Sequence, residues 1–183
     1  MKLMIASDIH GSKYYCEKML LALEKEKAEK LLLLGDILYH GPRNDLPKEY
    51  APKEVIKMLN AQKENILCVR GNCEAEVDQM VLEFPVMADY IALYIDGHTL
   101  YATHGHTINE NNPLPFKKGD ILLHGHTHVQ AIEEYENFTY INPGSVSIPK
   151  NGNQNSYMIY EDNIFYIKNL DGDIITTYTI SEK

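Results

Sequence analysis

The sequence predicts an α/β fold in which two β-sheets pack on each other with helices on the outside. Three observations lead to this prediction. Short aliphatic runs alternate with helical stretches up to about residue 70, strand-like segments separated by Asn, Gly and Asp follow, and no repeat or low-complexity linker interrupts them. A chain of 183 residues that is 44% hydrophobic can bury a sizeable core, so we expect one domain spanning residues 1–183.

The first elements along the chain are a strand, a helix and a second strand. The segment KLMIAS, residues 2–7, predicts the first strand. Ser12 is placed to cap a helix that ends among charged residues near Lys30, and the apolar residues of this helix recur at i, i+3, i+4 and i+7: Cys16, Met19, Leu20 and Leu23. Four leucines at 31–34 then predict a second, buried strand.

A second helix and a series of further strands follow. Pro52 suits the first turn of a helix that carries Val55, Ile56 and Leu59, and ILCV at 66–69 predicts a third strand. The dipeptide Asp96-Gly97 lies between IALYI and TLYAT, which is typical of a hairpin with a two-residue turn. The later strand-like segments are ILL (121–123), FTYI (138–141), SYMIYE (156–161), NIFYIKN (163–169) and IITTYTI (174–180).

Charge and cysteine content exclude several classes of protein. The chain has 17 basic and 26 acidic side chains, a formal net charge of −9 and no basic run, so we expect no stable nucleic-acid binding. The uncharged run Leu3–Ser7 is too short for a signal sequence or a membrane span, and we expect no membrane association. Three cysteines without a CxxC pair indicate neither a disulfide framework nor a thiolate zinc site, and a cytoplasmic location is expected.

Polar side chains follow the downstream ends of five predicted strands. These residues are Asp8, His10, Asp36, Asn72, His104, His126 and His128. Because the carboxyl ends of parallel strands form the crevice where ligands bind, segments spread over about 120 residues are expected to converge there. Oxygen and imidazole ligands without thiolate suit Mn²⁺, Fe, Zn²⁺ or Ni²⁺. Seven candidates exceed the needs of one catalytic zinc, and two divalent metal ions sharing a bridging carboxylate would use them all.

The motifs DIH, GD, GNCE, HGH and GHTH, in this order, resemble those of the calcineurin-like metallophosphoesterases, especially the small, manganese-dependent phosphodiesterases of bacteria and archaea. The segment NPGSVSIPK (142–150) also resembles that subfamily. The resemblance implies a four-layer α/β sandwich with two mixed sheets flanked by helices. It implies two metal ions, most commonly Mn²⁺. Asp8, His10 and His128 would bind the first ion, Asn72, His104 and His126 the second, and Asp36 would bridge both.

The activity that the resemblance implies is hydrolysis of phosphodiesters by in-line attack of a metal-bridging hydroxide. Two divalent ions, two aspartates and this hydroxide leave the site with a charge of about +1, which attracts a small anionic phosphoester. Arg43 and Asn44, close after Asp36, are candidates for holding a phosphate oxygen. Cys73 stands where most family members have a histidine thought to contact the phosphate and to help protonate the leaving group, so Cys73 is a candidate substrate contact. His106 or a metal-bound water is the alternative proton donor.

Several alternatives accompany this hypothesis. The chain could be a phosphomonoesterase of the same fold, or a non-catalytic scaffold that resembles the retromer subunit. A metallohydrolase for another bond, such as an amide, is disfavoured by the order of the motifs. His40, His98 and His124 are expected outside the set of metal ligands. Tyrosines and apolar residues in SYMIYEDNIFYIKN (156–169) suggest a homo-oligomer interface.

Overall fold

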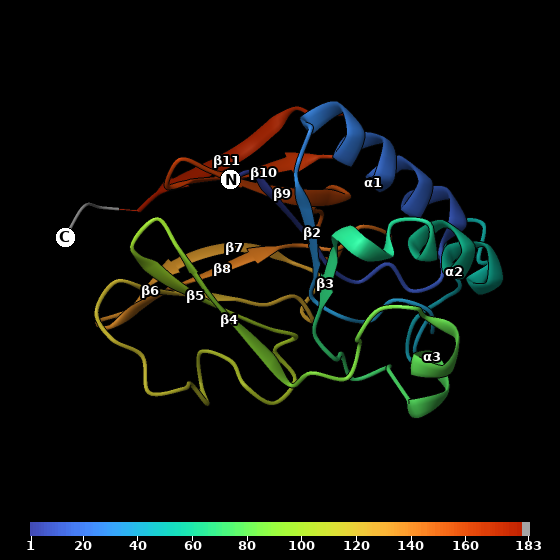
Figure 1. The fold of residues 1–183 in the computed structure, drawn as a ribbon, viewed down its shortest axis with the longest axis horizontal. Coiled ribbons are helices and arrows are strands. Elements are labelled where there is room, and N and C mark those ends of the chain that lie inside the picture. The colour runs from blue at the N-terminus through green and yellow to red at the C-terminus, as the bar shows by residue number, and fades with distance from the viewer. Residues whose placement is uncertain (181–183) are drawn as a thin grey trace.

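The computed structural model describes residues 1–180, which form two mixed β-sheets packed face to face (Figure 1). The six-stranded sheet has the order β11-β10-β9-β1-β2-β3, and the five-stranded sheet has the order β4-β5-β6-β8-β7. The strands of the first sheet are β1 (Leu3–Ala6), β2 (Lys30–Leu33), β3 (Ile66–Cys68), β9 (Ser156–Glu161), β10 (Ile164–Asn169) and β11 (Ile174–Thr179). Those of the second are β4 (Tyr90–Ile95), β5 (His98–Thr103), β6 (Asp120–Leu123), β7 (Gln130–Glu134) and β8 (Phe138–Pro143).

The helices are α1 (Lys13–Glu26), α2 (Pro52–Asn60), α3 (Glu76–Val81) and the short 3₁₀ helix η1 (Lys63–Asn65). Ser12 caps α1 as predicted, since its hydroxyl accepts a hydrogen bond from the Tyr15 amide at 3.2 Å. The helix ends at Glu26, before the predicted end near Lys30, because Lys27 adopts the left-handed conformation and Lys30 already belongs to β2. Pro52 occupies the first turn of α2, as predicted.

Side-chain alternation along the central strands divides the core into two main layers. Met4 and Leu31 face α1 and α2, which Figure 1 shows on the outside of the six-stranded sheet. Leu3 and Leu32 face the five-stranded sheet, where they pack with residues such as Ile121. The α/β class and the two packed sheets are therefore as predicted.

The outer face of the five-stranded sheet is covered differently from the outer face of the six-stranded sheet. Leu122, Phe138 and Tyr140 on this face pack against Phe116, which belongs to the segment between β5 and β6. Among the described residues this segment contains no helix, so the fourth layer of the expected sandwich is formed here by an irregular segment.

Two further features of the chain concern predictions from the sequence. The hairpin at Asp96-Gly97 is confirmed, since both residues have positive φ, 52° and 83°, as a two-residue turn of this kind requires. Of the tyrosines in the segment suggested for a subunit interface, Tyr157 and Tyr160 are buried within the chain and Tyr166 is partly exposed, and the interface stays a prediction. No helix in residues 1–180 is long and apolar enough to cross a membrane.

Candidate metal centre and active site

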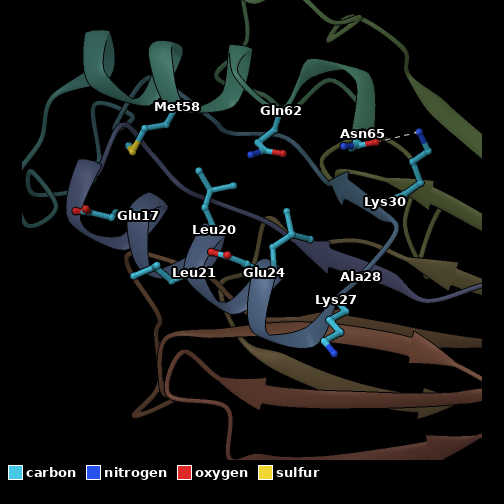
Figure 2. Close-up of a pocket in the computed structure, with 11 residues that line it drawn as sticks. Glu17, Leu20, Leu21, Glu24, Lys27, Ala28, Lys30, Met58, Gln62 and Asn65 are labelled. Atoms are coloured by element: carbon cyan, nitrogen blue, oxygen red, sulfur yellow. Dashed lines mark hydrogen bonds between the residues drawn. The ribbon is translucent and has the colours of Figure 1, made fainter.

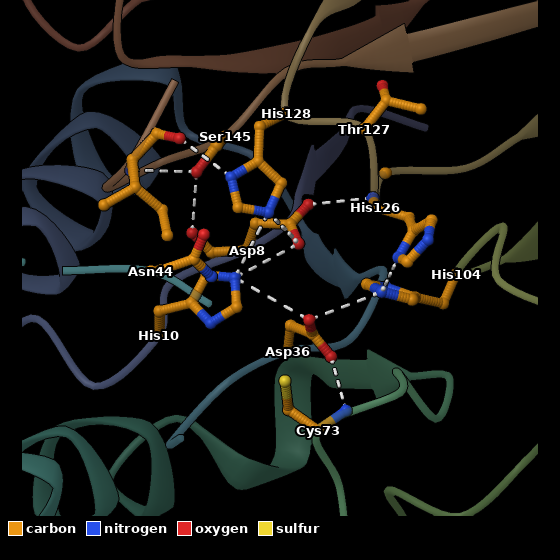
Figure 3. A network of polar contacts seen from close by, with 12 residues as sticks. Asp8, His10, Asp36, Asn44, Cys73, His104, His126, Thr127, His128 and Ser145 are labelled. Carbon is orange, nitrogen blue, oxygen red and sulfur yellow. Dashed lines mark hydrogen bonds and ion pairs between the residues drawn. The ribbon is translucent and has the colours of Figure 1, made fainter. Parts of the chain in front are cut away.

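The loops that follow β1, β2, β3, β5 and β6 meet at one end of the sheets, and all seven predicted metal ligands gather there. Figure 3 labels these ligands except Asn72, which contacts His104. The two sheets therefore contribute to one site. Neighbouring donor atoms of the seven candidate ligands lie 3.0–3.7 Å apart. An ion with bonds of about 2.1 Å to each ligand sets neighbouring donor atoms at about 3.0–3.4 Å, so the spacing fits metal coordination.

The first group of donors consists of Asp8, His10 and His128. The Nδ1 atoms of the two imidazoles lie 2.7 Å and 2.8 Å from the carbonyl oxygens of Tyr39 and Ile148, so each Nδ1 carries the proton and donates it. The two Nε2 atoms then face each other 3.3 Å apart with lone pairs, which requires a cation, a proton or a metal ion, between them. Asp8 Oδ1 is buried beside them and makes no hydrogen bond of its own. These residues fit a metal ion.

The second group consists of Asn72, His104 and His126. His104 Nδ1 donates to the Leu34 carbonyl oxygen at 2.7 Å, and its Nε2 therefore points into the site. That Nε2 lies 3.0 Å from Asn72 Oδ1 and 3.2 Å from His126 Nδ1. When His104 is neutral, three donor atoms for a metal ion thus converge here, as in the first group.

Asp36 lies between the two groups. Its Oδ2 is 3.7 Å from His10 Nε2 and 3.5 Å from His104 Nε2, one atom from each group. Its Oδ1 accepts a hydrogen bond from the Cys73 amide at 2.9 Å, which fixes the carboxylate. This is the position that a bridging carboxylate needs.

The charges in the site shift several pKa values. Burial alone would raise the pKa of Asp8, but the imidazoles of His10 and His128 outweigh it and hold the pKa well below the ordinary value. Burial disfavours protonated His104, yet the neighbouring Asp36 raises its pKa to about 9. Burial and the positive charge on His104 together lower the pKa of His126 to about 4. The site therefore favours ionised carboxylates facing a positive charge.

Five of the seven candidate ligands have backbone conformations that side chains disfavour. The φ angles of Asp8, His10, Asp36, His126 and His128 lie between 50° and 64°. Residues other than glycine adopt such angles at a cost of about 1–2 kcal/mol each and do so most often at functional sites. The turns at the strand ends thus direct these side chains into the site, whereas a regular strand would direct them elsewhere. The sequence did not reveal these left-handed conformations.

Glycines allow the loops to approach the ligands closely at two places. A Cβ atom on Gly125 would overlap Ser7 Oγ and lie 2.6 Å from Asp8 Oδ2. A Cβ atom on Gly71 would overlap Asp36 Oδ1. Any larger residue at either position would displace an aspartate of the site.

Glu74 connects two of the loops that carry ligands. It is 4% exposed, and its carboxylate accepts hydrogen bonds from the amides of Asp36 (2.8 Å), Ile37 (2.8 Å) and Gly71 (2.6 Å). The loop after β2 is thereby fixed to the loop after β3. This role was missed from the sequence, although Glu74 belongs to the GNCE motif.

The segment NPGSVSIPK makes hydrogen bonds that hold two residues of the first group of donors in place. The hydroxyls of Ser145 and Ser147 both donate to the main-chain carbonyl of Asp8 at 2.9 Å. The Ile148 carbonyl accepts from His128 Nδ1, and the Lys150 amide donates to the His128 carbonyl at 3.1 Å. The segment therefore positions ligands from two different strands.

A pocket of about 410 Å³ opens over the candidate ligands. The predicted substrate contacts Arg43, Asn44 and Cys73 line it. So do Thr127 and Lys150, which the sequence reasoning missed, although Lys150 ends the recognised segment NPGSVSIPK. Burial and the neighbouring Asp36 raise the pKa of the Cys73 thiol, which favours the neutral thiol over the thiolate.

The remaining histidines of interest lie outside this pocket. His106 is exposed, with its ring centroid 5.4 Å from that of His104, and it does not line the pocket. His124 is buried, stacks on Tyr140 and pairs its Nε2 with Glu110 Oε2 at 2.8 Å. Its partner is therefore a carboxylate away from the candidate ligands.

Comparisons with known proteins identify the family. The model of the calcineurin-like phosphoesterase superfamily domain matches residues 1–163. Phosphodiesterase YfcE of Escherichia coli is 42% identical over 182 residues, 99% of both chains, and phosphodiesterase MJ0936 of Methanocaldococcus jannaschii is 27% identical over 79% of this chain and 83% of that protein. The structure of the E. coli phosphoesterase YfcE matches with a TM-score of 0.96 over 99% of this chain and 100% of that one. Vps29 of Cryptosporidium parvum shares the fold, at 19% identity, a TM-score of 0.62 and 97% coverage of each chain. The chain belongs to the calcineurin-like phosphoesterase superfamily.

Proposed function

We propose that this protein is a dinuclear metal-dependent phosphodiesterase. One observation carries the proposal: three imidazoles donate Nδ1 to backbone carbonyls, and their Nε2 atoms converge on two buried aspartates. Such outer hydrogen bonds orient imidazoles for metal binding. The relatives named above as phosphodiesterases support the choice of reaction.

Each residue of the site has a proposed role. Asp8, His10 and His128 would hold one ion, Asn72, His104 and His126 would hold the other, and Asp36 would contribute to both. Two divalent ions, most commonly Mn²⁺ in the related phosphodiesterases, supply Lewis acidity and activate water for in-line attack on phosphorus. Arg43, Asn44 and Lys150 line the pocket above the ions and bind the non-reacting phosphate oxygens.

With Cys73 at this position, the enzyme is expected to prefer diesters, or monoesters with good leaving groups, over alkyl monoesters. The Cys73 thiol is a weak hydrogen-bond donor, and the raised pKa makes it a poorer general acid than an imidazolium. Since His106 does not line the pocket, we propose that the leaving group takes its proton from solvent, with His106 as the second candidate. Alkyl monoesters, which need this proton most, are then poor substrates.

The scaffold alternative has less support. Vps29 structures show that this fold is shared by other proteins, but at 19% identity the likeness concerns the fold alone. A scaffold has no need for seven converging donors or for an aspartate held between two groups of them. We therefore favour the enzyme, acting in the cytoplasm as a single domain, and leave a homo-oligomer as a prediction.

Metal content and turnover together test the proposal. Protein stripped with a chelator and reloaded with Mn²⁺ should contain close to two ions per chain and should hydrolyse bis(4-nitrophenyl) phosphate only when loaded. Asp36→Asn should lower kcat/KM by about 10²-fold or more and reduce the metal content, because one carboxylate supports both ions. Asp171→Asn, the same change at an exposed carboxylate, is the control. Full activity of the stripped protein would exclude the proposed function.

A further inference from the structure

An apolar cavity adjoins the pocket above the candidate ligands. Its volume is about 400 Å³, and it lies between α2, α3 and the segment that follows β2. The residues that line it are Leu38, Tyr39, Tyr50, Pro52, Ile56, Cys73, Ala75, Val77, Asp78 and Val81. Cys73 also lines the catalytic pocket, so the two spaces meet at this side chain.

We propose that this cavity binds an apolar ester group of the phosphodiester substrate, aryl or branched alkyl, while the phosphate lies over the metal ions. The proposal rests on the phosphodiesterase function proposed above and specifies its substrate class.

The cavity is within reach of a substrate at the metal centre. Cys73 Sγ lies within 4.8 Å of donor atoms of His10 and Asp36. Tyr39 lines the cavity, and its carbonyl accepts the hydrogen bond from His10 Nδ1, so the cavity also lies next to a candidate ligand. A group joined to the phosphorus by one ester oxygen therefore needs to extend only past the Cys73 thiol.

The lining favours a neutral group. It contains no Lys or Arg, and its one charged side chain, Asp78, would repel a second phosphate. The Asp78 carboxylate already accepts a hydrogen bond from the Ala75 amide at 2.7 Å and is held at the start of α3. Val77 and Val81 are 60% and 40% exposed, which is apolar surface that an ester group would cover.

A second cavity provides a matched control. It has a volume of about 490 Å³ and lies between α1 and α2, lined by Leu20, Leu21 and Met58 together with Glu17, Glu24 and Lys27 (Figure 2). None of its lining residues belongs to the metal centre or to the pocket above it. Leu21 is 53% exposed on α1, much as Val77 is on α3.

The test compares two monoanionic diester analogues that differ in one group, methyl phenylphosphonate and methyl methylphosphonate. Calorimetry on the manganese-loaded full chain gives both Kd values without requiring turnover. We expect the phenyl analogue to bind about tenfold more tightly, because the ring is removed from water. Val77→Asp and Val81→Asp should each reduce this preference at least threefold with metal content unchanged, whereas Leu21→Asp should leave it unaltered.

The outcomes separate this inference from the proposed function. Equal affinity of wild type for the two analogues, or a preference that neither Val77→Asp nor Val81→Asp alters, overturns the inference alone. A preference that Leu21→Asp abolishes assigns the ring to the cavity between α1 and α2 and overturns it as well. If neither analogue binds and aryl diesters are not hydrolysed, the phosphodiesterase function fails and the inference fails with it.

Discussion

Replacing Glu74 by glutamine should loosen the junction between the loops that carry Asp36 and Asn72. The native carboxylate accepts three backbone hydrogen bonds in a buried position, two through Oε2 and one through Oε1. A glutamine has one acceptor oxygen and one amide donor group. If its oxygen keeps the amides of Asp36 and Gly71, its NH₂ group must face the Ile37 amide, donor against donor.

The expected loss of unfolding free energy follows from these hydrogen bonds. One hydrogen bond to a charged acceptor is lost and one buried donor is left without a partner, which together amount to about 3 kcal/mol of unfolding free energy. In a chain of this size that corresponds to a fall in Tm of about 6–12 °C. Because Asp36 is anchored by the same carboxylate, the affinity for metal should fall as well, and kcat/KM with it.

Thermal unfolding of the chelator-treated protein gives the change in Tm without any contribution from bound metal. Calorimetric titration with Mn²⁺ then gives the change in metal affinity. Glu76→Gln changes a carboxylate at the start of α3 that makes no such bonds and should leave both quantities unaltered. If Glu74→Gln lowered Tm by less than 1 °C and bound Mn²⁺ as wild type does, the assignment of Glu74 as a positioning residue would be wrong.

Three other substitutions test separate features. Gly125→Ala should abolish stoichiometric metal binding, measured by elemental analysis, because the new Cβ overlaps Ser7 Oγ, and normal loading would contradict the close approach. Cys73→His should raise kcat/KM for an alkyl monoester relative to an aryl diester by up to about 10²-fold, and an unchanged ratio would remove the leaving-group argument. Burial would raise the pKa of Glu26, but Lys168 and other partners outweigh it and lower the pKa, so ionised Glu26 stabilises the fold above its unfolded pKa and less as the pH falls through its folded pKa. Glu26→Gln should therefore lower the unfolding free energy by about 1 kcal/mol at pH 7 and hardly at pH 3, and a loss that is the same at both would show that charge is not involved.

The sequence predicts most of the fold because its strands carry local signals. The leucines at 31–34 are aliphatic on both faces, and the Asp96-Gly97 dipeptide fixes a turn whatever surrounds it. Elements without such signals were missed. The helix α3 has only six residues, too few for a helical period, and β7, Gln130–Glu134, has two glutamates among its five residues.

Convergence of the candidate ligands was predictable, but their orientation was not. Parallel strands place their carboxyl ends together, which groups Asp8 with Asp36 in one sheet. The packing of the two sheets then brings Asp8 and His128 to one site. The left-handed backbone at five of these positions has no signature in the residue types. The contacts of Glu74 with Asp36 and Ile37 span 38 and 37 residues, so only the folded chain shows them.

The arrangement of the site has an energetic consequence for the choice between enzyme and scaffold. Five left-handed residues cost about 1–2 kcal/mol each, and the buried Asp8 Oδ1 without a hydrogen bond adds about 1–3 kcal/mol. The sheets do not need these features, since β1 ends at Ala6 and β2 at Leu33, before Asp8 and Asp36. A cation between the facing lone pairs of His10 and His128 offsets the cost directly, because it interacts with the atoms that otherwise repel each other. A protein that used the fold only as a binding surface would be more stable with these turns relaxed. Left-handed residues also occur in turns elsewhere, such as Lys27 and Asp96, but the five at the site surround converging donor atoms, which favours a metal-binding role over protein binding alone.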